Sequence, residues 1–327
     1  MVLSLEEIYI KSSEGGCFSR EECHDILNYP VDNLNNLLDT TLKIRQLYWG
    51  KKVSVQILTN ARSGDCSQNC AYCAQSCLSK ADINKYSLIE YEQMLNNGKI
   101  CLDKKVHRHC IGFSGISFTD EEVEKFCLYI ERLKREANTR ICCSIGFLTE
   151  KQATKLKNAG VGRINHNLNT GKNFYHNICT THTYEQRVAN IQMLKKLGFE
   201  MCCGGIVGLG ESDDDLVDML LDIKKINPES IPINFLLPLK GTPLEFHDTS
   251  KLTTEYCLKV LSLTRLLNPK ASIRCAAGRE VYFKDKQNFV FYAVNSIFAS
   301  GYLTATGQNI DDTVRLIQDS GFEYEME

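Results

Sequence analysis

Long apolar runs are missing from this chain. No stretch approaches the roughly 18 consecutive apolar residues that a membrane-spanning helix needs, and the first residues, MVLSLEEIYIKSSEGG, contain no basic segment followed by an apolar one. The formal net charge is only -2 and acidic and basic residues are interspersed, so no basic patch for nucleic acid or for an anionic membrane is present. These absences predict a cytoplasmic protein that acts on small molecules, without a nucleic-acid or membrane partner.

The composition is that of an ordinary globular protein, with 43% hydrophobic and 24% charged residues among 327. Short β-rich runs recur along most of the chain with helical segments between them, which is typical of β-α-β units and a parallel sheet. Eight such runs are present, at residues 53–58, 107–115, 141–147, 161–168, 200–209, 230–239, 271–278 and 295–303. Eight units are enough to close a (β/α)8 barrel of the TIM type.

The predicted fold class is therefore α/β, with additions at both ends of the barrel. Residues 1–49 are expected to form an N-terminal helical extension, with helices near 20–27 and 31–48. Residues 50–307 are expected to form the barrel, which no low-complexity segment or linker interrupts. Residues 308–327 are expected to form a C-terminal helix and an acidic tail.

The two faces of the predicted strands differ in polarity, because successive side chains on a strand point to opposite sides. Cys142 and Cys202 lie on polar or small faces, whereas their neighbours Cys143 and Cys203 lie on apolar ones, and residues 165–169 carry asparagine at alternate positions. In an ordinary parallel barrel both faces are apolar. A polar lumen face predicts a barrel built around a ligand. The alternative is a structural network in which these polar residues satisfy one another.

Sixteen cysteines are many for a chain of this kind. Without a secretion signal, metal or iron-sulfur ligation is favoured over disulfides, although some cysteines are expected to be small buried hydrophobic residues. Cys66, Cys70 and Cys73 follow the first strand in C-x-x-x-C-x-x-C spacing, where a barrel places its active site. Three clustered thiolates favour an iron-sulfur cluster with one open iron. A zinc site is the alternative, and it would need Cys77 or a distant residue as a further ligand.

This cysteine loop, followed by a barrel, resembles the radical S-adenosylmethionine superfamily. In that superfamily three cysteines hold a 4Fe-4S cluster, and the amino and carboxylate groups of S-adenosylmethionine chelate the fourth iron. Tyr72 occupies the aromatic position that borders the adenine. The resemblance implies a barrel of the radical SAM type and cleavage of the cofactor to methionine and a 5'-deoxyadenosyl radical.

Within the superfamily, residues 50–307 are most similar to the biotin synthases. The stretches that carry this resemblance are INHNLNT, TTHTYEQR, CCGGIVGLGES, ESIPINFLLPLKGTPL, RCAAGRE and NSIFASGYLT. The resemblance implies a second cluster, of the 2Fe-2S type, deep in the barrel and held by Cys110, Cys142, Cys202 and Arg274. Chemistry alone would assign Arg274 to pairing with an anion, since a guanidinium stays protonated and offers no lone pair. Its role as a ligand rests on the resemblance.

The resemblance also implies which residues bind small molecules. For S-adenosylmethionine they are Tyr72, Asn167, Asn169, Arg187, Gly204 and Gly205. For dethiobiotin they are Asn167, Asn234, Thr304 and Thr306. The chain departs from the family at two of these places. Asn169 stands where many members have an aspartate, and Ala305 separates two threonines that are adjacent in many members.

The implied function is that of a sulfurtransferase in biotin biosynthesis, in which the radical abstracts hydrogens from dethiobiotin and the inner cluster donates the sulfur. The expected partners are dethiobiotin, a flavodoxin- or ferredoxin-type electron donor and a second copy of the chain in a homodimer. Two alternatives stay open: another radical enzyme of the same branch, such as a maturase or a mutase, and a non-catalytic iron-sulfur carrier. The presence of all four inner-cluster positions favours sulfur insertion.

Overall fold

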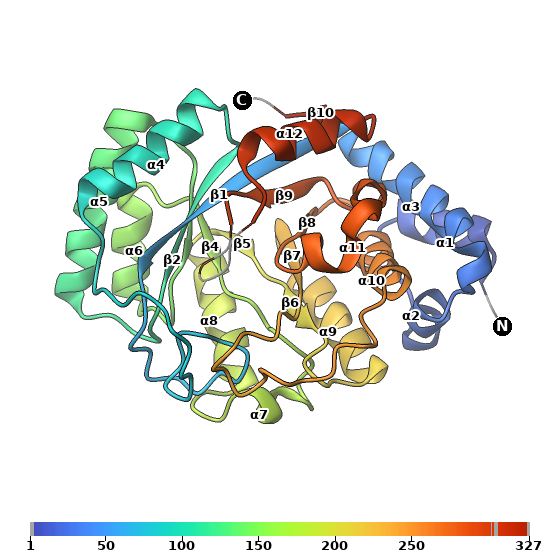
Figure 1. Cartoon of the computed structure of the whole chain (residues 1–327), viewed down its shortest axis with the longest axis horizontal. Coiled ribbons are helices and arrows are strands. Elements are labelled where there is room, and N and C mark those ends of the chain that lie inside the picture. The colour runs from blue at the N-terminus through green and yellow to red at the C-terminus, as the bar shows by residue number, and fades with distance from the viewer. Residues whose placement is uncertain (1–2, 302, 304–306, 326–327) are drawn as a thin grey trace.

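A computed structural model describes residues 3–301, 303 and 307–325 of the chain. Its centre is a closed barrel of parallel strands (Figure 1). The barrel strands are β1 (Lys52–Arg62), β2 (Arg108–Phe113), β3 (Ile141–Ser144), β4 (Arg163–Asn165), β5 (Glu200–Cys202), β6 (Gly205–Val207), β7 (Ser230–Phe235), β8 (Ser272–Cys275) and β9 (Ser296–Ala299). Strand β9 pairs in parallel with β1, with Ser296 opposite Ser54, and this pairing closes the barrel. The predicted (β/α)8 fold is confirmed.

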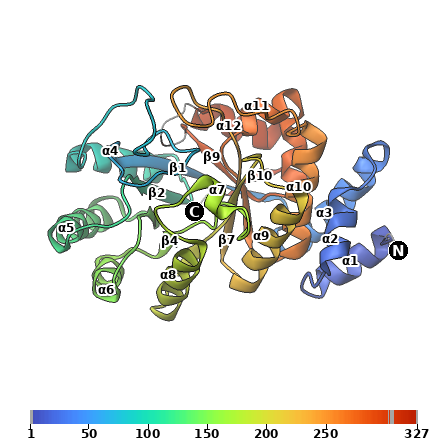
Figure 2. The ribbon, with the colours of Figure 1, turned by 90° about the horizontal axis from the view of Figure 1, so that it is seen from below.

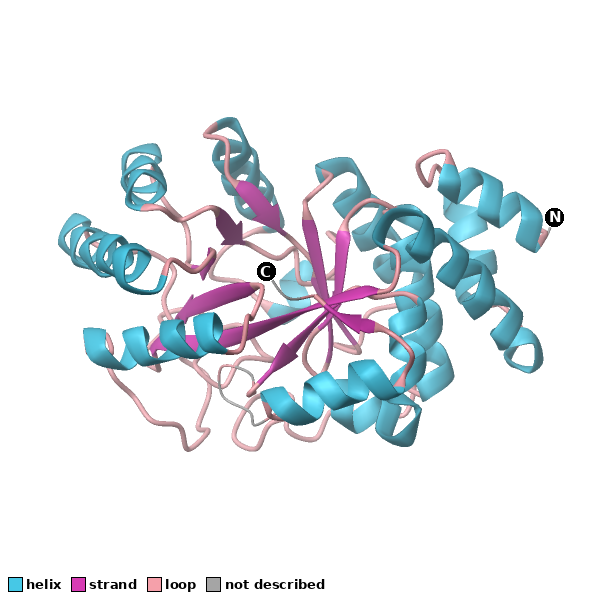
Figure 3. Ribbon diagram, turned by 90° about the horizontal axis from the view of Figure 1, so that it is seen from above, coloured by secondary structure: helices cyan, strands magenta, loops and turns pink. Residues whose placement is uncertain are grey.

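Helices surround the barrel (Figure 3). They are α4 (Tyr91–Asp103), α5 (Asp120–Ala137), α6 (Glu150–Ala159), α7 (Tyr175–Ile178), α8 (Tyr184–Lys196), α9 (Asp213–Ile226), α10 (Thr254–Leu267), α11 (Arg279–Phe283) and the 3-10 helix η2 (Lys284–Tyr292). Capping boxes begin α5, α6, α8 and α9, at Thr119, Thr149, Thr183 and Ser212. In each box a side-chain oxygen accepts from an otherwise unpaired backbone N–H, so these starts are determined locally. No helix of the described part is long and apolar enough to cross a membrane.

The N-terminal extension lies to one side of the barrel, next to α10 (Figure 2). It consists of α1 (Leu5–Ser13), α2 (Arg20–Leu27), the 3-10 helix η1 (Val31–Asn33) and α3 (Leu34–Trp49). Helices α2 and α3 agree with the predicted stretches, whereas α1, which begins at a capping box on Ser4, was not predicted. Helix α2 packs on α9 and α3 packs on α10, so the extension is in contact with the barrel helices. The domain boundary expected after residue 49 stays a prediction.

The C-terminal segment contains the expected helix, α12 (Ile310–Asp319), and an additional strand. Strand β10 (Glu323–Tyr324) pairs in parallel with β1 through Lys52 opposite Glu323, at the upper end of the barrel in Figure 1. The backbone N–H of Glu323 donates to the carbonyl of Lys51 at 2.9 Å. A two-residue strand carries no periodicity, so the sequence predicted only a tail here, and the boundary expected after residue 307 stays a prediction.

The run predicted as one strand at residues 200–209 is divided into β5 and β6 around Gly204. A Cβ atom at Gly204 would lie 1.8 Å from the carbonyl oxygen of Pro232 on β7, and one at Gly205 would lie 2.2 Å from the sulfur of Met219. At Gly204 the contact is with backbone, so only glycine permits this approach to β7, whereas the contact at Gly205 is with a flexible methionine side chain.

Gly204→Ala is expected to lower the free energy of unfolding by about 1–3 kcal/mol, because the added methyl group meets a backbone carbonyl that cannot move aside without shifting β7. Urea titrations of both proteins measure this difference. The matched control is Gly162→Ala, whose Cβ would meet nothing nearer than 3.9 Å. Equal unfolding midpoints for the two variants would contradict the packing explanation.

The barrel separates the buried side chains into two groups. The larger one fills the space between strands and helices and includes Cys143, Cys203 and Cys275. Burial raises the pKa of Cys203 and of Cys275 to about 12, so these thiols stay protonated and act as small hydrophobic residues. The smaller group lies inside the barrel and consists of three other cysteines, described below.

Candidate active site

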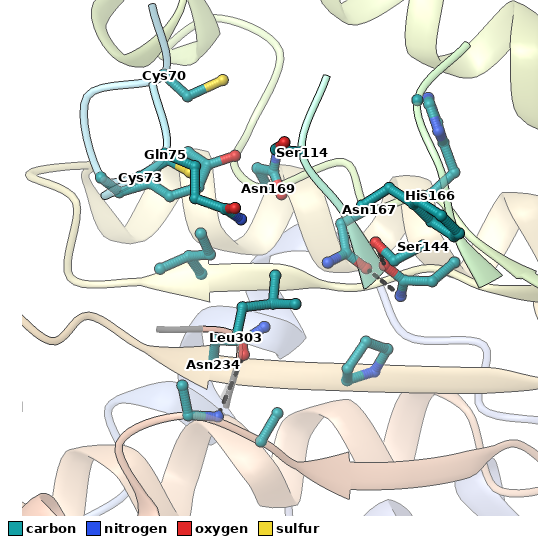
Figure 4. A pocket seen from close by; sticks show the side chains of 18 of the residues that line it. Cys70, Cys73, Gln75, Ser114, Ser144, His166, Asn167, Asn169, Asn234 and Leu303 are labelled. Atoms are coloured by element: carbon teal, nitrogen blue, oxygen red, sulfur yellow. Dashed lines mark hydrogen bonds between the residues drawn. The ribbon is translucent and has the colours of Figure 1, made fainter. Parts of the chain in front are cut away.

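A cavity of about 400 Å³ lies inside the barrel (Figure 4). It is lined by the loop after β1 and by side chains from most of the strands. The residues that the sequence predicted and that line it are Cys66, Cys70, Tyr72, Cys73, Cys110, Cys142, Asn167, Asn169, Arg187, Cys202, Asn234 and Arg274. Gly204 and Gly205 are not among the lining residues and instead pack against β7 and α9. Thr304 and Thr306 lie outside the described residues.

The loop that carries Cys66, Cys70 and Cys73 is held by hydrogen bonds at several points. The backbone N–H of Cys66 donates to the carbonyl of Gln75 at 3.3 Å, and that of Ala71 donates to the carbonyl of Ile178 at 2.9 Å. The three cysteines are partly exposed and have free thiols. The loop thus presents three sulfur ligands toward the cavity from a backbone that is tied to the last residue of α7.

Asn69 is a residue of this loop that sequence reasoning did not single out. Its side-chain oxygen accepts from the backbone N–H groups of Thr180, at 3.0 Å, and of Thr181, at 3.3 Å. Its amide nitrogen donates to the hydroxyl of Thr180 at 2.6 Å. Asn69 therefore fixes the distance between the cysteine loop and the TTHT segment, two motifs more than 100 residues apart that no local signal connects.

Cys110, Cys142 and Cys202 form the small buried group inside the barrel, packed with Leu58 and Phe298. The β2–β3 register sets Cys110 directly opposite Cys142. A hydrogen bond from the Cys142 thiol lowers the pKa of Cys110, and the same bond raises the pKa of Cys142 to about 12. Three soft sulfur donors from three strands therefore meet deep in the cavity, and Cys142 and Cys202 lie on the strand faces that the alternation pattern predicted.

Arg274 comes from β8 and lies beside these cysteines. Its NH1 atom is 3.9 Å from the sulfur of Cys202. Its other nitrogens donate to the hydroxyls of Ser296 and Ser230, each at 3.2 Å, and its guanidinium lies 4.7 Å from the ring centroid of Phe298. The side chain is 2% exposed. A fully buried guanidinium with one side turned to a sulfur fits an anionic group at the cysteines.

Arg108 and Arg163 are two further buried cations near the inner cysteines, and the sequence analysis missed both. Both donate to Glu200 Oε2, Arg108 at 3.2 Å and Arg163 at 3.0 Å. The charges of these arginines and of Arg274 act to lower the pKa of the inner cysteines, but hydrogen bonds between the thiols and burial still raise the pKa of Cys142 and of Cys202. Arg108 could have been found from the alternation of the strand, because it lies two residues before Cys110 and therefore on the same strand face.

The asparagines of the INHNLNT segment form a ladder along the cavity wall. Asn165 Nδ2 donates to Asn167 Oδ1 at 3.1 Å, and the backbone N–H of Gly204 donates to the same oxygen at 3.0 Å. With its oxygen occupied, Asn167 keeps its amide N–H groups for a ligand. Asn169 has φ of 74°, in the left-handed region that asparagine tolerates better than most residues.

Asn234 on β7 is held by backbone groups at both ends of its amide. Its Nδ2 donates to the carbonyl of Gly205 at 3.1 Å, and the backbone N–H of Ala277 donates to its Oδ1 at 3.2 Å. One N–H and one lone pair of the amide stay free of these bonds. The side chain is thus fixed in orientation and still able to donate and accept.

Arg187 comes from α8, and its fork of donors is held by three neighbours. Its Nε donates to the hydroxyl of Tyr175, NH1 donates to the carbonyl of Asn167 at 3.1 Å, and NH2 donates to His182 Nε2 at 2.8 Å. No carboxylate of the described residues pairs with Arg187, which lines the cavity. A guanidinium without a protein anion is suited to bind the carboxylate of a ligand.

Arg187→Lys is expected to weaken S-adenosylmethionine binding about 10- to 100-fold, since hydrogen bonds to charged groups contribute about 1.5–3 kcal/mol each and an ammonium cannot reproduce the planar fork. Equilibrium dialysis with cluster-loaded protein measures the dissociation constant, and the iron content is expected to stay unchanged. Arg315→Lys on the exposed face of α12 is the control. Unchanged cofactor affinity in Arg187→Lys would rule out the carboxylate role.

Two buried polar atoms of the cavity wall have no hydrogen-bond partner within the described chain, Ser114 Oγ and His166 Nε2. Burial lowers the pKa of His166 well below its usual value, so the ring is neutral. Neither residue was predicted from the sequence to take part in ligand binding.

Comparisons with known proteins agree with this geometry. The pattern of the Radical SAM superfamily matches residues 62–223, and the pattern of the Biotin and Thiamin Synthesis associated domain matches residues 232–323. Among solved structures, methylornithine synthase superimposes with a TM-score of 0.85 at 21% identity over 97% of both chains. The FeFe-hydrogenase maturase from Carboxydothermus hydrogenoformans superimposes with a TM-score of 0.82 at 18% identity, over 98% of this chain and 79% of that one. At such identities these likenesses concern the fold alone.

Sequence relatives are closer. The biotin synthase of Bacillus licheniformis is 41% identical over 312 residues, which cover 95% of this chain and 93% of the relative. The biotin synthase of Bacillus subtilis is 39% identical over 305 residues, which cover 93% of this chain and 90% of the relative. Identity of this extent over nearly the whole length of both chains shows that this chain belongs to the biotin synthase family.

Proposed function

We propose that the chain converts dethiobiotin to biotin by radical S-adenosylmethionine chemistry, with an inner 2Fe-2S cluster as the sulfur donor. The observation that carries this proposal is the arrangement of two sulfur-ligand sets in one cavity. Cys66, Cys70 and Cys73 come from the loop after β1, and a second cysteine set with Arg274 lies deeper in the barrel. Membership of the biotin synthase family supports the same assignment.

The loop cysteines suit a 4Fe-4S cluster by the chemistry of their donors. Three sulfurs leave one iron for the amino and carboxylate groups of S-adenosylmethionine, and Arg187 supplies a guanidinium to the same cavity. When bound, such a cluster supplies the electron that cleaves the cofactor and yields a 5'-deoxyadenosyl radical.

The inner set suits a smaller, anionic cluster. Cys110, Cys142 and Cys202 meet within one buried group, and Arg274 turns one nitrogen toward the sulfur of Cys202. The buried cations of this part of the barrel stabilise negative charge that three thiolates and bound sulfide would bring. When bound, a 2Fe-2S cluster there would supply the sulfur atom for the product.

The protein's own contribution is positioning and exclusion of water. The cavity wall includes apolar side chains, among them Leu58, Phe113 and Phe298, which help to exclude water from the site. Asn167 holds an oriented amide that can donate to a ureido ring, and Asn234 holds one that can both donate and accept. A substrate held between the two ligand sets has its reacting carbons within reach of both, which turns an intermolecular encounter into an intramolecular one.

The alternatives from the sequence gain no specific support. The likeness to a maturase and to methylornithine synthase concerns the fold, and a non-catalytic carrier would not need the cavity with Arg187 and the asparagine ladder. A flavodoxin- or ferredoxin-type electron donor and a homodimer stay predictions.

The decisive experiment is an anaerobic incubation of iron- and sulfide-reconstituted protein with S-adenosylmethionine, reduced flavodoxin and dethiobiotin, with biotin and 5'-deoxyadenosine quantified by mass spectrometry. Formation of both products is the expected result. Deoxyadenosine without biotin would point to another substrate, and the absence of both from fully loaded protein would overturn the proposal.

A further inference from the structure

Cys179 is a buried cysteine that neither the sequence analysis nor the proposed function uses. It directly follows α7 and is 3% exposed. Its sulfur lies 3.8 Å from the sulfur of Cys70 and 3.3 Å from Nδ1 of His182. One ligand atom from each of Cys70, Cys179 and His182 lies within 4.8 Å of the others. Two thiols and an imidazole therefore converge at one point beside the cysteine loop.

Two ligand–ligand distances are close to those around a single tetrahedral ion, and one ligand atom from each of the three residues lies within 4.8 Å of the others. With zinc–sulfur bonds of about 2.3 Å, two thiolate sulfurs on one zinc ion lie about 3.8 Å apart, and a sulfur and an imidazole nitrogen lie about 3.5 Å apart. The Cys179 sulfur is 3.8 Å from Cys70 Sγ and 3.8 Å from His182 Nε2. Thiolates on different irons of one cluster lie farther apart, because the metal–metal separation intervenes.

The ring of His182 is oriented for ligation through Nε2. The guanidinium of Arg187 has only donors, so His182 Nε2, at 2.8 Å from its NH2 atom, must carry the lone pair. The proton is therefore on Nδ1, which donates to Gln68 Oε1 at 2.8 Å. Histidine ligands of metal ions usually donate their second N–H to an oxygen acceptor in this way. His182 and Cys70 line the cavity, which provides a path for the ion.

We propose that the cluster-free chain binds one thiophilic divalent cation of the zinc class through Cys70, Cys179 and His182, with a water as fourth ligand. The ion takes the place of Arg187 as the partner of His182 Nε2. Because Cys70 would also be a ligand of the 4Fe-4S cluster, the ion and that cluster exclude each other. This exclusion rests on the proposed function, whereas the site itself rests only on the geometry of the triad.

The site is tested on full-length protein purified anaerobically, stripped of iron with a chelator and titrated with Co²⁺. Tetrahedral cobalt with thiolate ligands shows intense ligand-field and charge-transfer absorption, so the probe reports the geometry directly. Cys179→Ala and His182→Gln are each expected to weaken the binding of one equivalent by more than about 100-fold, because even loss of an outer partner costs about 10- to 100-fold. Any cobalt bound by the inner cysteines is expected to be the same in wild type and in the variants. The difference in bound cobalt between them therefore reports binding at Cys70, Cys179 and His182.

Three controls decide between the triad and the loop cysteines alone. Cys77→Ala, at an exposed cysteine of the same region, and Cys66→Ala are both expected to keep the site. Gln68→Ala is expected to weaken it about 10- to 100-fold through loss of the acceptor for Nδ1. If Cys66→Ala abolishes the cobalt spectrum while Cys179→Ala keeps it, the ion is held by the loop cysteines and the proposal is wrong. Circular dichroism of each variant verifies folding.

The exclusion has its own readout, the rate at which iron and sulfide build a cluster on the zinc-loaded chain. Zinc is expected to slow assembly at the loop in wild type and to have less effect in Cys179→Ala. Equal inhibition in both proteins would show that Cys179 is not part of the competing site. This measurement follows cluster absorption and needs no turnover.

Discussion

Replacing Cys66 by alanine is expected to reduce both 5'-deoxyadenosine and biotin formation to background. Three thiolates are already fewer than the four that protein-bound 4Fe-4S clusters usually have, so two do not retain the cluster. About four fewer iron atoms per chain are expected after reconstitution. Cys66 is a better choice than Cys70 for this test, because Cys70 has another thiol, that of Cys179, 3.8 Å away as a possible substitute.

Cys77→Ala is the matched control for Cys66→Ala, since Cys77 is an exposed cysteine a few residues beyond the C-x-x-x-C-x-x-C loop. Its iron content and both product yields are expected to equal those of wild type. Iron retention and normal deoxyadenosine formation in Cys66→Ala would exclude the loop as the cluster site, whereas loss of both in Cys77→Ala would make Cys77 a ligand.

Cys142→Ala is expected to abolish biotin while leaving cleavage of S-adenosylmethionine. The inner sulfur ligands are separate from the loop ligands, so loss of one removes about two iron atoms per chain and spares the outer site. Deoxyadenosine still forms, and biotin falls to background because the sulfur donor is missing. Mass spectrometry of both products and iron analysis of the same samples measure the separation of the two activities.

The neighbouring substitution Cys143→Ala provides a stringent control, because it removes the same atoms one residue along β3. Cys143 faces the helices, is fully buried and belongs to the outer core, and burial raises its pKa well above the ordinary value. A cost of about 1–2 kcal/mol in unfolding free energy is expected from the lost packing, with iron content and product ratio unchanged. Equal iron loss in both variants would contradict the inward and outward assignment.

The zinc alternative that the cysteine spacing left open takes a different form in the folded chain. From the sequence, a zinc site at the loop would need Cys77 or a distant residue as its further ligand. In the structure a distant cysteine, Cys179, lies next to Cys70. The spacing of Cys179 and His182, C-x-x-H, was present in the sequence as a signal. It did not indicate a site, because nothing local connects residue 179 with residue 70.

The N-terminal and C-terminal segments show where local patterns were insufficient. Helices α2 and α3 were expected from their apolar spacing, and α12 from the residues after 307, but β10 depends on pairing with β1 across most of the chain. Likewise the division of residues 200–209 into β5 and β6 depends on the contact between Gly204 and the carbonyl of Pro232. These features arise from long-range contacts, which a period of two or 3.6 residues does not encode.

The sequence by itself determined the eight β-rich runs, the barrel class and the faces on which Cys142 and Cys202 lie. Alternation on a strand is a local property, so Cys142 and Cys143 had to point to opposite sides in any fold that formed β3. Only the tertiary structure decided the distances between motifs: Arg274 beside Cys202, Arg187 between Tyr175 and His182, and Cys179 against Cys70. Closure of the barrel through β1 and β9 brings these segments together, and no contact of that kind follows from spacing along the chain.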